Sequence, residues 1–262
     1  MGINNMEAKE LRELARTGKN FTTSGLAKGH VQTNVVILPK AHAFDFTLFC
    51  IRNPKPCPIV EVFDPGEFVS SIAEDSDIRT DIPEYKIFRN GIFSELSTDI
   101  KNIWRSDFVV FLLGCSFTFE NELVKNGIEL PYFTNKKNVP MFITSLDTKK
   151  AGNFSGKLVV TQRWIKKDKI VKAVQSTSRF PNQHGTPIHI GNSEEIGIKD
   201  PYKPDFGDPW IPKNPKDYTP MYWACGVTPQ LALEAAKIDI SITHSPGKMF
   251  VTDLKDEDMA VI

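Results

Sequence analysis

Short apolar runs alternate along much of this chain with segments whose apolar residues recur at helical spacing. The run TNVVILP (33–39) is followed by AHAFDFTLFCIRN (41–53), in which apolar residues lie three and four positions apart. The same order of strand and helix patterns returns at 108–127 and at 221–245. Strands that are apolar at nearly every position are covered on both faces, which is typical of parallel sheets flanked by helices. We therefore expect an α/β fold with a mostly parallel sheet, helices on both of its faces, and a ligand site at the carboxyl ends of the strands.

The middle of the chain departs from this alternation. PMFITSL (140–146) and KLVVTQRWI (157–165) are two strand patterns with no helix between them, and a helix pattern follows only afterwards. Two adjacent strands joined by a glycine-containing loop predict an antiparallel hairpin. The sequence thus predicts a main α/β sheet domain formed by residues 1–128 and 200–262, and a smaller inserted α+β subdomain formed by residues 129–199.

A second hairpin is predicted over YKIFRNGIFSEL (85–96). Its apolar residues alternate on either side of Asn90-Gly91. This dipeptide favours the left-handed backbone that a two-residue hairpin turn requires. We expect the turn at these two residues.

Composition and charge restrict the classes of function. The 262 residues include 40% hydrophobic residues, enough to bury a core without disulfides or a structural metal. Basic and acidic residues number 32 each, so no net field attracts nucleic acid or an anionic membrane. Four cysteines are too few for a disulfide scaffold, and no apolar run approaches the ~20 residues of a membrane span. We expect a cytoplasmic protein with a small-molecule partner and no nucleic-acid or membrane partner, and we leave homo-oligomerisation open.

Two connections from a strand to a helix each carry a cysteine. We name them the Cys115 turn, in FLLGCSFTFE (111–120), and the Cys225 turn, in YWACGVTPQ (222–230). Backbone N–H groups at a helix N-terminus bind anions and lower the pKa of a nearby thiol, so the two turns can bind two carboxylates, or one carboxylate and an oxyanion. A buried structural cysteine is the alternative for either thiol. The candidate residues are Cys115 and Ser116 in the first turn, and Cys225, Gly226 and the expected N-cap Thr228 in the second.

Other candidates are histidines and charged residues in loops. His184 and His244 lie beside glycine or proline turns, where an imidazole can face a cleft and titrate near neutrality, whereas His189 lies in an apolar alternation typical of a core residue. Arg179, Arg79 and Asp81 can bind the carboxylate or ammonium of a substrate, although Arg79 and Asp81 can also pair within their own loop. The chain lacks HxH, HExxH, GxGxxG and GxxxxGK[ST] motifs, so we predict neither a metal nor a cofactor.

Eight motifs, in order, give the chain a family resemblance. VQTNVVILP, RNPKPCPIVEV, DIRTDIP, LLGCSFTFE, SRFPNQHGTPIHIG, PDFGD, YWACGVTPQ and THSPGKMFVTD closely resemble the hydro-lyase family that is related to D-glutamate cyclase, over about residues 28–253. The resemblance implies a bacterial cytoplasmic enzyme of two α/β subdomains that acts on D-glutamate or a related small acid.

The resemblance also implies a reaction. In it the α-amine of D-glutamate attacks its own γ-carboxyl carbon, and water leaves to give 5-oxo-D-proline. Such a reaction needs a base, an acid and oxyanion donors. The candidates are Arg179 or Arg79 for the α-carboxylate, the two cysteine turns for the γ-carboxyl, and His184 or His244 for proton transfer, with a thioester through a cysteine as a variant. Two alternatives stay open: a non-catalytic cytoplasmic binder of a small carboxylate or amino acid, and an enzyme that dehydrates another hydroxy or amino acid.

Overall fold

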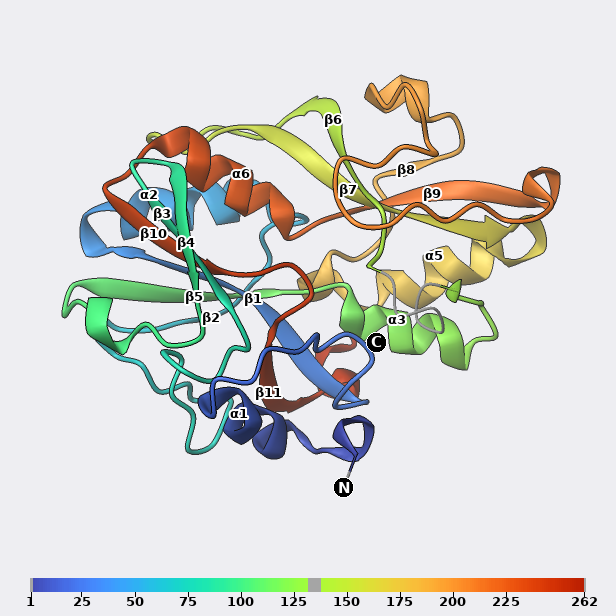
Figure 1. Ribbon diagram of the computed structural model, residues 1–262. Helices are drawn as coiled ribbons and strands as arrows, with labels where there is room; N and C mark the ends of the chain where they lie inside the picture. The colour runs from blue at the N-terminus through green and yellow to red at the C-terminus, as the bar shows by residue number, and fades with distance from the viewer. Residues whose placement is uncertain (1, 132–137, 262) are drawn as a thin grey trace.

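The chain folds around two β-sheets that lie side by side (Figure 1). The computed structural model describes residues 2–131 and 138–261. Sheet A, on the left of Figure 1, has the strand order β2-β5-β1-β10-β3-β4, and β11 also pairs with β1. Its strands are β1 (His30–Pro39), β2 (Ile59–Val62), β3 (Tyr85–Arg89), β4 (Ile92–Ser97), β5 (Phe108–Gly114), β10 (Ile240–His244) and β11 (Phe250–Lys255). Sheet B, on the right, has the order β6-β7-β9-β8 and consists of β6 (Met141–Asp147), β7 (Lys157–Lys166), β8 (His189–Ile190) and β9 (Tyr218–Ala224).

Five α-helices in the described residues cover these sheets. They are α1 (Ala8–Arg16), α2 (Lys40–Arg52), α3 (Phe117–Lys125), α5 (Ile170–Ser178) and α6 (Val227–Ala236), and short 3-10 turns lie between them. The strand and helix patterns named in the sequence analysis therefore correspond to real elements. The predicted hairpin is confirmed as β3 and β4, and Asn90 and Gly91 take φ values of 53° and 76° at its turn.

The prediction of a mostly parallel sheet is wrong, because every pairing between the described strands is antiparallel. β1, α2 and β2 follow one another in the chain as a strand, a helix and a strand, and β1 and β2 share one direction because both run antiparallel to β5. They are not neighbours, however, because β5 lies between them. The pattern of apolar residues gives the order of strands and helices along the chain, and it does not record which strand lies between two others in the sheet.

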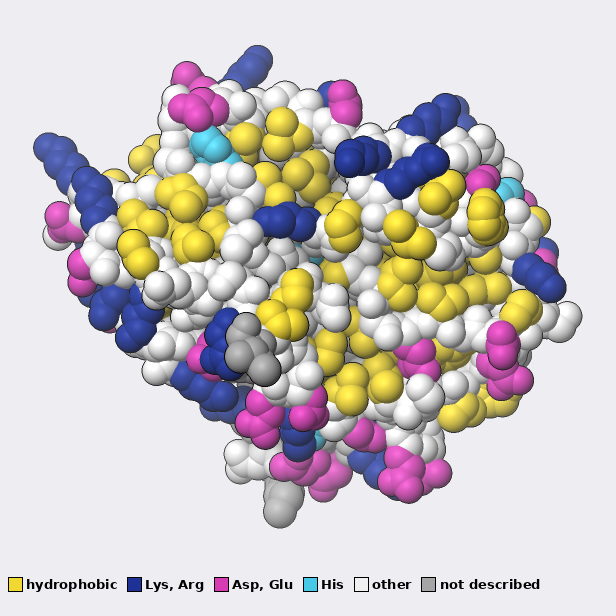
Figure 2. All heavy atoms as spheres, turned by 180° about the vertical axis from the view of Figure 1, so that it is seen from behind, with side chains coloured by type: hydrophobic (Ala, Val, Ile, Leu, Met, Phe, Trp, Pro, Cys, Tyr) yellow, Lys and Arg dark blue, Asp and Glu magenta, His cyan; other side chains and the backbone are white. Residues whose placement is uncertain are grey.

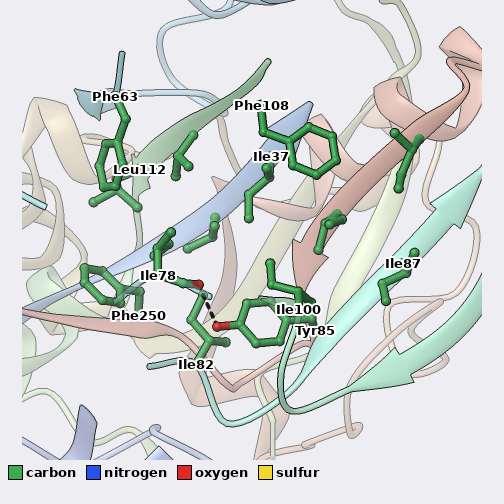
Figure 3. Close-up of a cluster of buried hydrophobic side chains, with 14 of the residues drawn as sticks. Ile37, Phe63, Ile78, Ile82, Tyr85, Ile87, Ile100, Phe108, Leu112 and Phe250 are labelled. Carbon is green, nitrogen blue, oxygen red and sulfur yellow. Dashed lines mark hydrogen bonds between the residues drawn. The ribbon is translucent and has the colours of Figure 1, made fainter. Parts of the chain in front are cut away.

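Continuous apolar runs arise here because both faces of sheet A are covered, which does not require parallel strands. Successive residues of β1 and β5 alternate between two clusters on opposite faces: Val35 and Leu112 lie in one, and Val36 and Phe111 in the other. Among the described residues, only the second cluster is covered by α-helices, α2 and α6. The first is covered by the irregular segments 63–84 and 98–104, which flank the hairpin of β3 and β4. The Ile78 carbonyl in the first of these segments accepts a hydrogen bond of 2.6 Å from the hydroxyl of Tyr85 in β3 (Figure 3). The prediction of helices on both faces of the sheet is therefore wrong.

Sheet B carries its helices on one face. The cluster under α3 and α5 takes side chains from both helices and from β7 and β9, including Phe119, Ala173, Val159 and Trp223. Sheet B takes β6, β7 and β8 from the segment 129–199, and β9 from the segment that follows it. The division into a main domain and an inserted subdomain stays a prediction.

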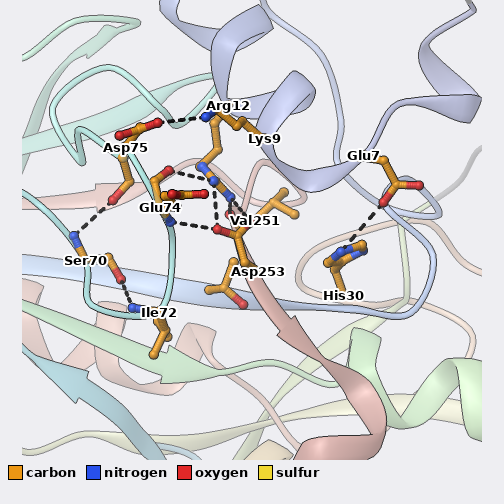
Figure 4. Close-up of polar contacts among 12 residues, drawn as sticks. Glu7, Lys9, Arg12, His30, Ser70, Ile72, Glu74, Asp75, Val251 and Asp253 are labelled. Atoms are coloured by element: carbon orange, nitrogen blue, oxygen red, sulfur yellow. Dashed lines mark hydrogen bonds and ion pairs between the residues drawn. The ribbon is translucent and has the colours of Figure 1, made fainter.

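The N-terminal helix is fastened to sheet A by one buried arginine. Arg12 of α1 donates hydrogen bonds to both carboxylate oxygens of Asp253, at 2.8 and 3.1 Å, and to the carbonyl oxygens of Val251 and Glu74 (Figure 4). Asp253 also accepts from the backbone N–H of Glu74. This network joins α1, β11 and the segment that covers the first face of sheet A.

The surface mixes apolar and charged side chains. Figure 2 shows hydrophobic side chains over much of the rear face, with acidic and basic side chains mainly toward its margin. Among the exposed apolar residues are Phe44 and Ile51 of α2. Over the described residues no helix combines the length and apolarity that crossing a bilayer requires.

Candidate functional site

A small cavity lies where the Cys115 turn and the Cys225 turn meet. Its volume is about 60 Å³, which favours a small molecule over a polymer. The cavity is lined by residues at the ends of strands and the starts of helices, and by loop residues such as Ser24, Pro246 and Gly247. Of the residues that the sequence singled out, the structure places Cys115, Ser116, His184, Cys225, Gly226 and His244 in this lining.

The path of the chain brings the two turns together. Strand β5 belongs to sheet A, but the helix that follows it, α3, packs on sheet B (Figure 1). Strand β9 belongs to sheet B, but the helix that follows it, α6, packs on sheet A. The two connections therefore cross between the sheets in opposite senses. Their helix N-termini, at Ser116 and Phe117 and at Gly226 and Val227, face one cavity at the junction.

The helix starts differ in detail from the prediction. Ser116 occupies the N-cap position of α3, but its side chain makes no capping hydrogen bond. Helix α6 begins two residues earlier than predicted, with Gly226 as the N-cap. Thr228 therefore lies inside the first turn, where its hydroxyl accepts a hydrogen bond of 3.0 Å from the backbone N–H of Val159 in β7. Thr228 joins α6 to sheet B and is not part of the cavity lining.

At both thiols, burial has a larger effect on the pKa than the helix N-terminus has. It raises the pKa of Cys115 to about 12, although a hydrogen bond from the backbone of Phe117 acts in the opposite direction. Burial likewise raises the pKa of Cys225 to about 11, against a hydrogen bond from the backbone N–H of Val227. The expectation that the turn would lower the pKa of Cys115 is wrong, because removing water from a thiolate costs more than one backbone dipole returns. Both thiols are neutral at pH 7.

The two cavity histidines have opposite tautomers. Nδ1 of His184 lies 2.7 Å from the carbonyl oxygen of Lys55, which can only accept, so Nδ1 carries the hydrogen and Nε2 has a lone pair. Nδ1 of His244 accepts a hydrogen bond of 3.1 Å from the backbone N–H of Val35, so in its neutral form Nε2 carries the hydrogen. Within the described residues neither Nε2 has a hydrogen-bond partner. One ring can accept a proton in the cavity and the other can donate a hydrogen bond.

Burial also keeps both rings uncharged. It lowers the pKa of His184 and of His244 from the ordinary value of 6.5 to about 4. The expectation that these rings titrate near neutrality is wrong, because both are almost wholly removed from water. His184 is further constrained by its backbone, which takes the left-handed conformation at φ 75°. Residues in such conformations occur often at functional sites.

The lowered pKa values predict that the fold is sensitive to acid. Above pH 6.5 both histidines are neutral whether the chain is folded or unfolded, so their protonation does not lower the free energy of unfolding. As the pH falls from 6.5 toward 4, the unfolded chain binds protons that the folded chain excludes, and the free energy of unfolding decreases. Each histidine should account for roughly 3 kcal/mol over this window. Urea denaturation between pH 4 and 7 measures the effect; His184→Gln should flatten the pH dependence, and an unchanged curve would contradict the lowered pKa.

Amide side chains complete the cavity and were not singled out from the sequence. Asn34 of β1 donates a hydrogen bond of 2.7 Å to the carbonyl oxygen of Gly114, which fixes it between the two turns. Gln230, one turn into α6, is 5% exposed, and its buried Nε2 has no partner among the described residues. A buried donor without a partner is costly, so Gln230 is suited to bind an oxygen atom of a ligand.

We expect Gly226→Ala to impair the site through Asn34. A Cβ atom at residue 226 would lie 2.4 Å from the Asn34 amide, which the bond to Gly114 prevents from moving freely. The φ of Gly226 is −66°, so alanine is not strained there and the effect is local. We predict a cost of about 1–3 kcal/mol in stability and a loss of turnover. Melting temperature and steady-state kinetics test this, with Gly156→Ala as the control, because a Cβ there meets no atom closer than 3.9 Å.

A buried ion pair lies directly behind the cavity. Arg163 of β7 and Glu120 of α3 form a salt bridge, and their side chains are 1% and 0% exposed. Arg163 also donates hydrogen bonds to Ser116 and Thr161, both of which line the cavity. The sequence did offer a signal for this pair: an arginine in the middle of the apolar strand KLVVTQRWI, and a glutamate on the apolar side of a helix that follows a buried strand.

The remaining charged candidates lie outside the cavity. Arg79 forms a salt bridge with Asp77 at 2.8 Å and stacks on the ring of Phe68. Asp81 is buried and forms a salt bridge with Arg16 of α1. Arg179 ends α5 and is exposed. In the described part of the chain, no group of three or more His, Cys, Asp or Glu residues could bind a metal ion.

Comparisons with known proteins agree on one family. A family model described as D-glutamate cyclase matches residues 109–253, more than half of the chain. A protein named "Putative hydro-lyase" from Geobacillus kaustophilus is 51% identical over 259 residues, covering 98% of each chain. One of the same name from Bacillus subtilis is 48% identical and covers 98% of this chain and 100% of its own. Among solved structures, a nitrogen repressor-like protein from Methanococcus jannaschii covers 93% of this chain and 97% of its own at 11% identity, with a TM-score of 0.39, which is too low to inform fold or function.

Proposed function

Because the chain belongs to the D-glutamate cyclase family of hydro-lyases, we propose that it converts D-glutamate into 5-oxo-D-proline and water in the cavity between the two cysteine turns. One observation carries the proposal: two helix N-termini and two neutral histidines of opposite tautomer face the same small cavity. The helix ends suit the two carboxylates of the substrate, and the histidines suit the transfer of its protons.

Binding depends on dipoles, because no arginine or lysine lines the described part of the cavity. The backbone N–H groups that begin α3 and α6 attract one carboxylate each. The amides of Asn34 and Gln230 lie beside them and supply further hydrogen bonds. With a carboxylate at each end, the chain of the substrate must curl, which brings the amine close to the γ-carboxyl carbon.

Proton transfer follows from the tautomers. The lone pair on Nε2 of His184 accepts a proton from the ammonium group, which leaves a nucleophilic amine. The new bond joins nitrogen to the γ-carboxyl carbon, while Nε2–H of His244 donates a hydrogen bond to the γ-carboxyl oxygen that departs and keeps its own proton. The nitrogen loses two protons to Nε2 of His184, one before the attack and one after it, and His184 passes each in turn to the departing oxygen, which leaves as water. Both rings end neutral, and the reaction needs no external proton source. Neither neutral thiol is required as a nucleophile.

The direct test is turnover by the purified protein. We expect 5-oxoproline to form from D-glutamate and to be detected by mass spectrometry. L-glutamate and small hydroxy acids provide the comparison, and product from one of those alone would assign a different substrate. Saturable binding of D-glutamate without product would instead favour the non-catalytic carboxylate binder.

A further inference from the structure

We propose that Arg163, which lies outside the cavity lining, is a positioning residue that fixes the Cys115 turn and the Cys225 turn relative to each other. The expected effect on turnover rests on the proposed function. The effect of Arg163 on the position of the two turns can be tested without any substrate. It is carried by the contacts that Arg163 makes with both turns.

The contacts with the Cys115 turn come from one edge of the guanidinium. Nη2 of Arg163 donates to Ser116 Oγ at 3.1 Å and forms the salt bridge with the Glu120 carboxylate. Ser116 is the N-cap of α3 and lines the cavity, and Glu120 lies one turn further along the same helix. Because Ser116 does not cap its own helix, its hydroxyl is oriented by Arg163.

The other contacts reach sheet B, the Cys225 turn and, through Phe119, the first helix again. Nη1 of Arg163 donates to Thr161 Oγ1 at 2.8 Å, and Thr161 lines the cavity. The guanidinium carbon lies 5.0 Å from the ring centre of Phe119 and 5.2 Å from that of Trp223. Trp223 precedes Cys225 by two residues in the chain. One side chain therefore contacts the first helix and the strand that leads into the second.

Arginine suits this place better than lysine does. Its planar group donates in several fixed directions and stacks on aromatic rings, whereas an ammonium group is a point charge that cannot make both kinds of contact. The charge also reaches the cavity: it acts to lower the pKa of Cys115 and of Cys225, and it opposes protonation of His184.

The experiment is a double-mutant cycle between Arg163→Lys and Ser116→Ala. Each single variant should lower kcat/KM by about 10–100-fold, because small displacements of groups at a site are costly. The double variant should be no worse than the poorer single variant, because both break the same contact. Circular dichroism confirms that each variant is folded at the assay temperature. Arg105→Lys is the matched control, since Arg105 forms exposed salt bridges with Asp107 and Asp239.

A second measurement needs no substrate. Alkylation of Cys115 and Cys225 by iodoacetamide, followed by peptide mass spectrometry, should be several-fold faster in Arg163→Lys than in the parent, because both turns lose a contact. If Arg163→Lys does not fold, Thr161→Val removes one contact and leaves the ion pair, and it should show the same change. Parent-like alkylation, or additive losses in the cycle, would overturn the proposal. If the parent turns over none of the acids tested, the proposed function is wrong, and alkylation alone decides the role of Arg163.

Discussion

Replacing His244 with asparagine is expected to lower turnover by about 10²–10⁴-fold while changing substrate binding little. An asparagine oxygen can accept the hydrogen bond from the Val35 N–H that Nδ1 of His244 accepts in the parent, so the end of β10 keeps its contact with β1. What the variant loses is the Nε2–H group in the cavity. Steady-state kinetics and melting temperature, measured on the same preparation, separate the two effects.

His189→Asn is the matched control for this variant. His189 lies on β8, where Nε2 is 2.6 Å from the carbonyl oxygen of Asn192 and the ring packs near Tyr222. It does not line the cavity. We expect a lower melting temperature and near-parent turnover. If His244→Asn showed this same pattern, a destabilised but fully active protein, His244 would be removed from the proposed site.

Local patterns predicted the elements of this fold well. Apolar strands closed by turn residues, and Asn90-Gly91 between two alternating runs, depend on interactions within a few residues of each other. The direction of neighbouring strands does not depend on such local interactions. The place of β5 between β1 and β2 follows from a long excursion through the hairpin of β3 and β4, and no periodicity in the sequence records it.

In the candidate site, too, local features could be predicted and features that depend on distant segments could not. His244 and the two cysteine turns were found because turn residues follow strands there, and His184 because it lies beside a glycine turn; the structure brings them to one cavity. Their pKa values could not be predicted in this way, because burial depends on segments distant in sequence. Arg79 illustrates a choice that the sequence left open: its charge could bind a ligand or pair within its own loop, and the structure pairs it with Asp77, two residues away.

Replacing Glu120 with glutamine is expected to lower the free energy of unfolding by about 3–5 kcal/mol. The substitution keeps the size of the side chain and removes its charge, so the guanidinium of Arg163 stays charged in a place from which water is excluded. An exposed pair gives the contrast: Asp107→Asn removes a carboxylate from Arg105 and should cost less than 1 kcal/mol, roughly the value of a surface salt bridge. Urea denaturation at pH 7 measures both.

The double variant Glu120→Leu with Arg163→Met tests the cause of this loss. If the loss comes from an uncompensated charge, removing both charges should restore much of the stability, because two apolar side chains of similar size avoid the cost of desolvation. Turnover should stay low in the double variant, since the hydrogen bonds from Arg163 to Ser116 and Thr161 are absent. A Glu120→Gln protein as stable as the parent would show that the buried pair does not stabilise the junction between the sheets. A double variant less stable than Glu120→Gln would show that residues 120 and 163 contribute packing and not charge.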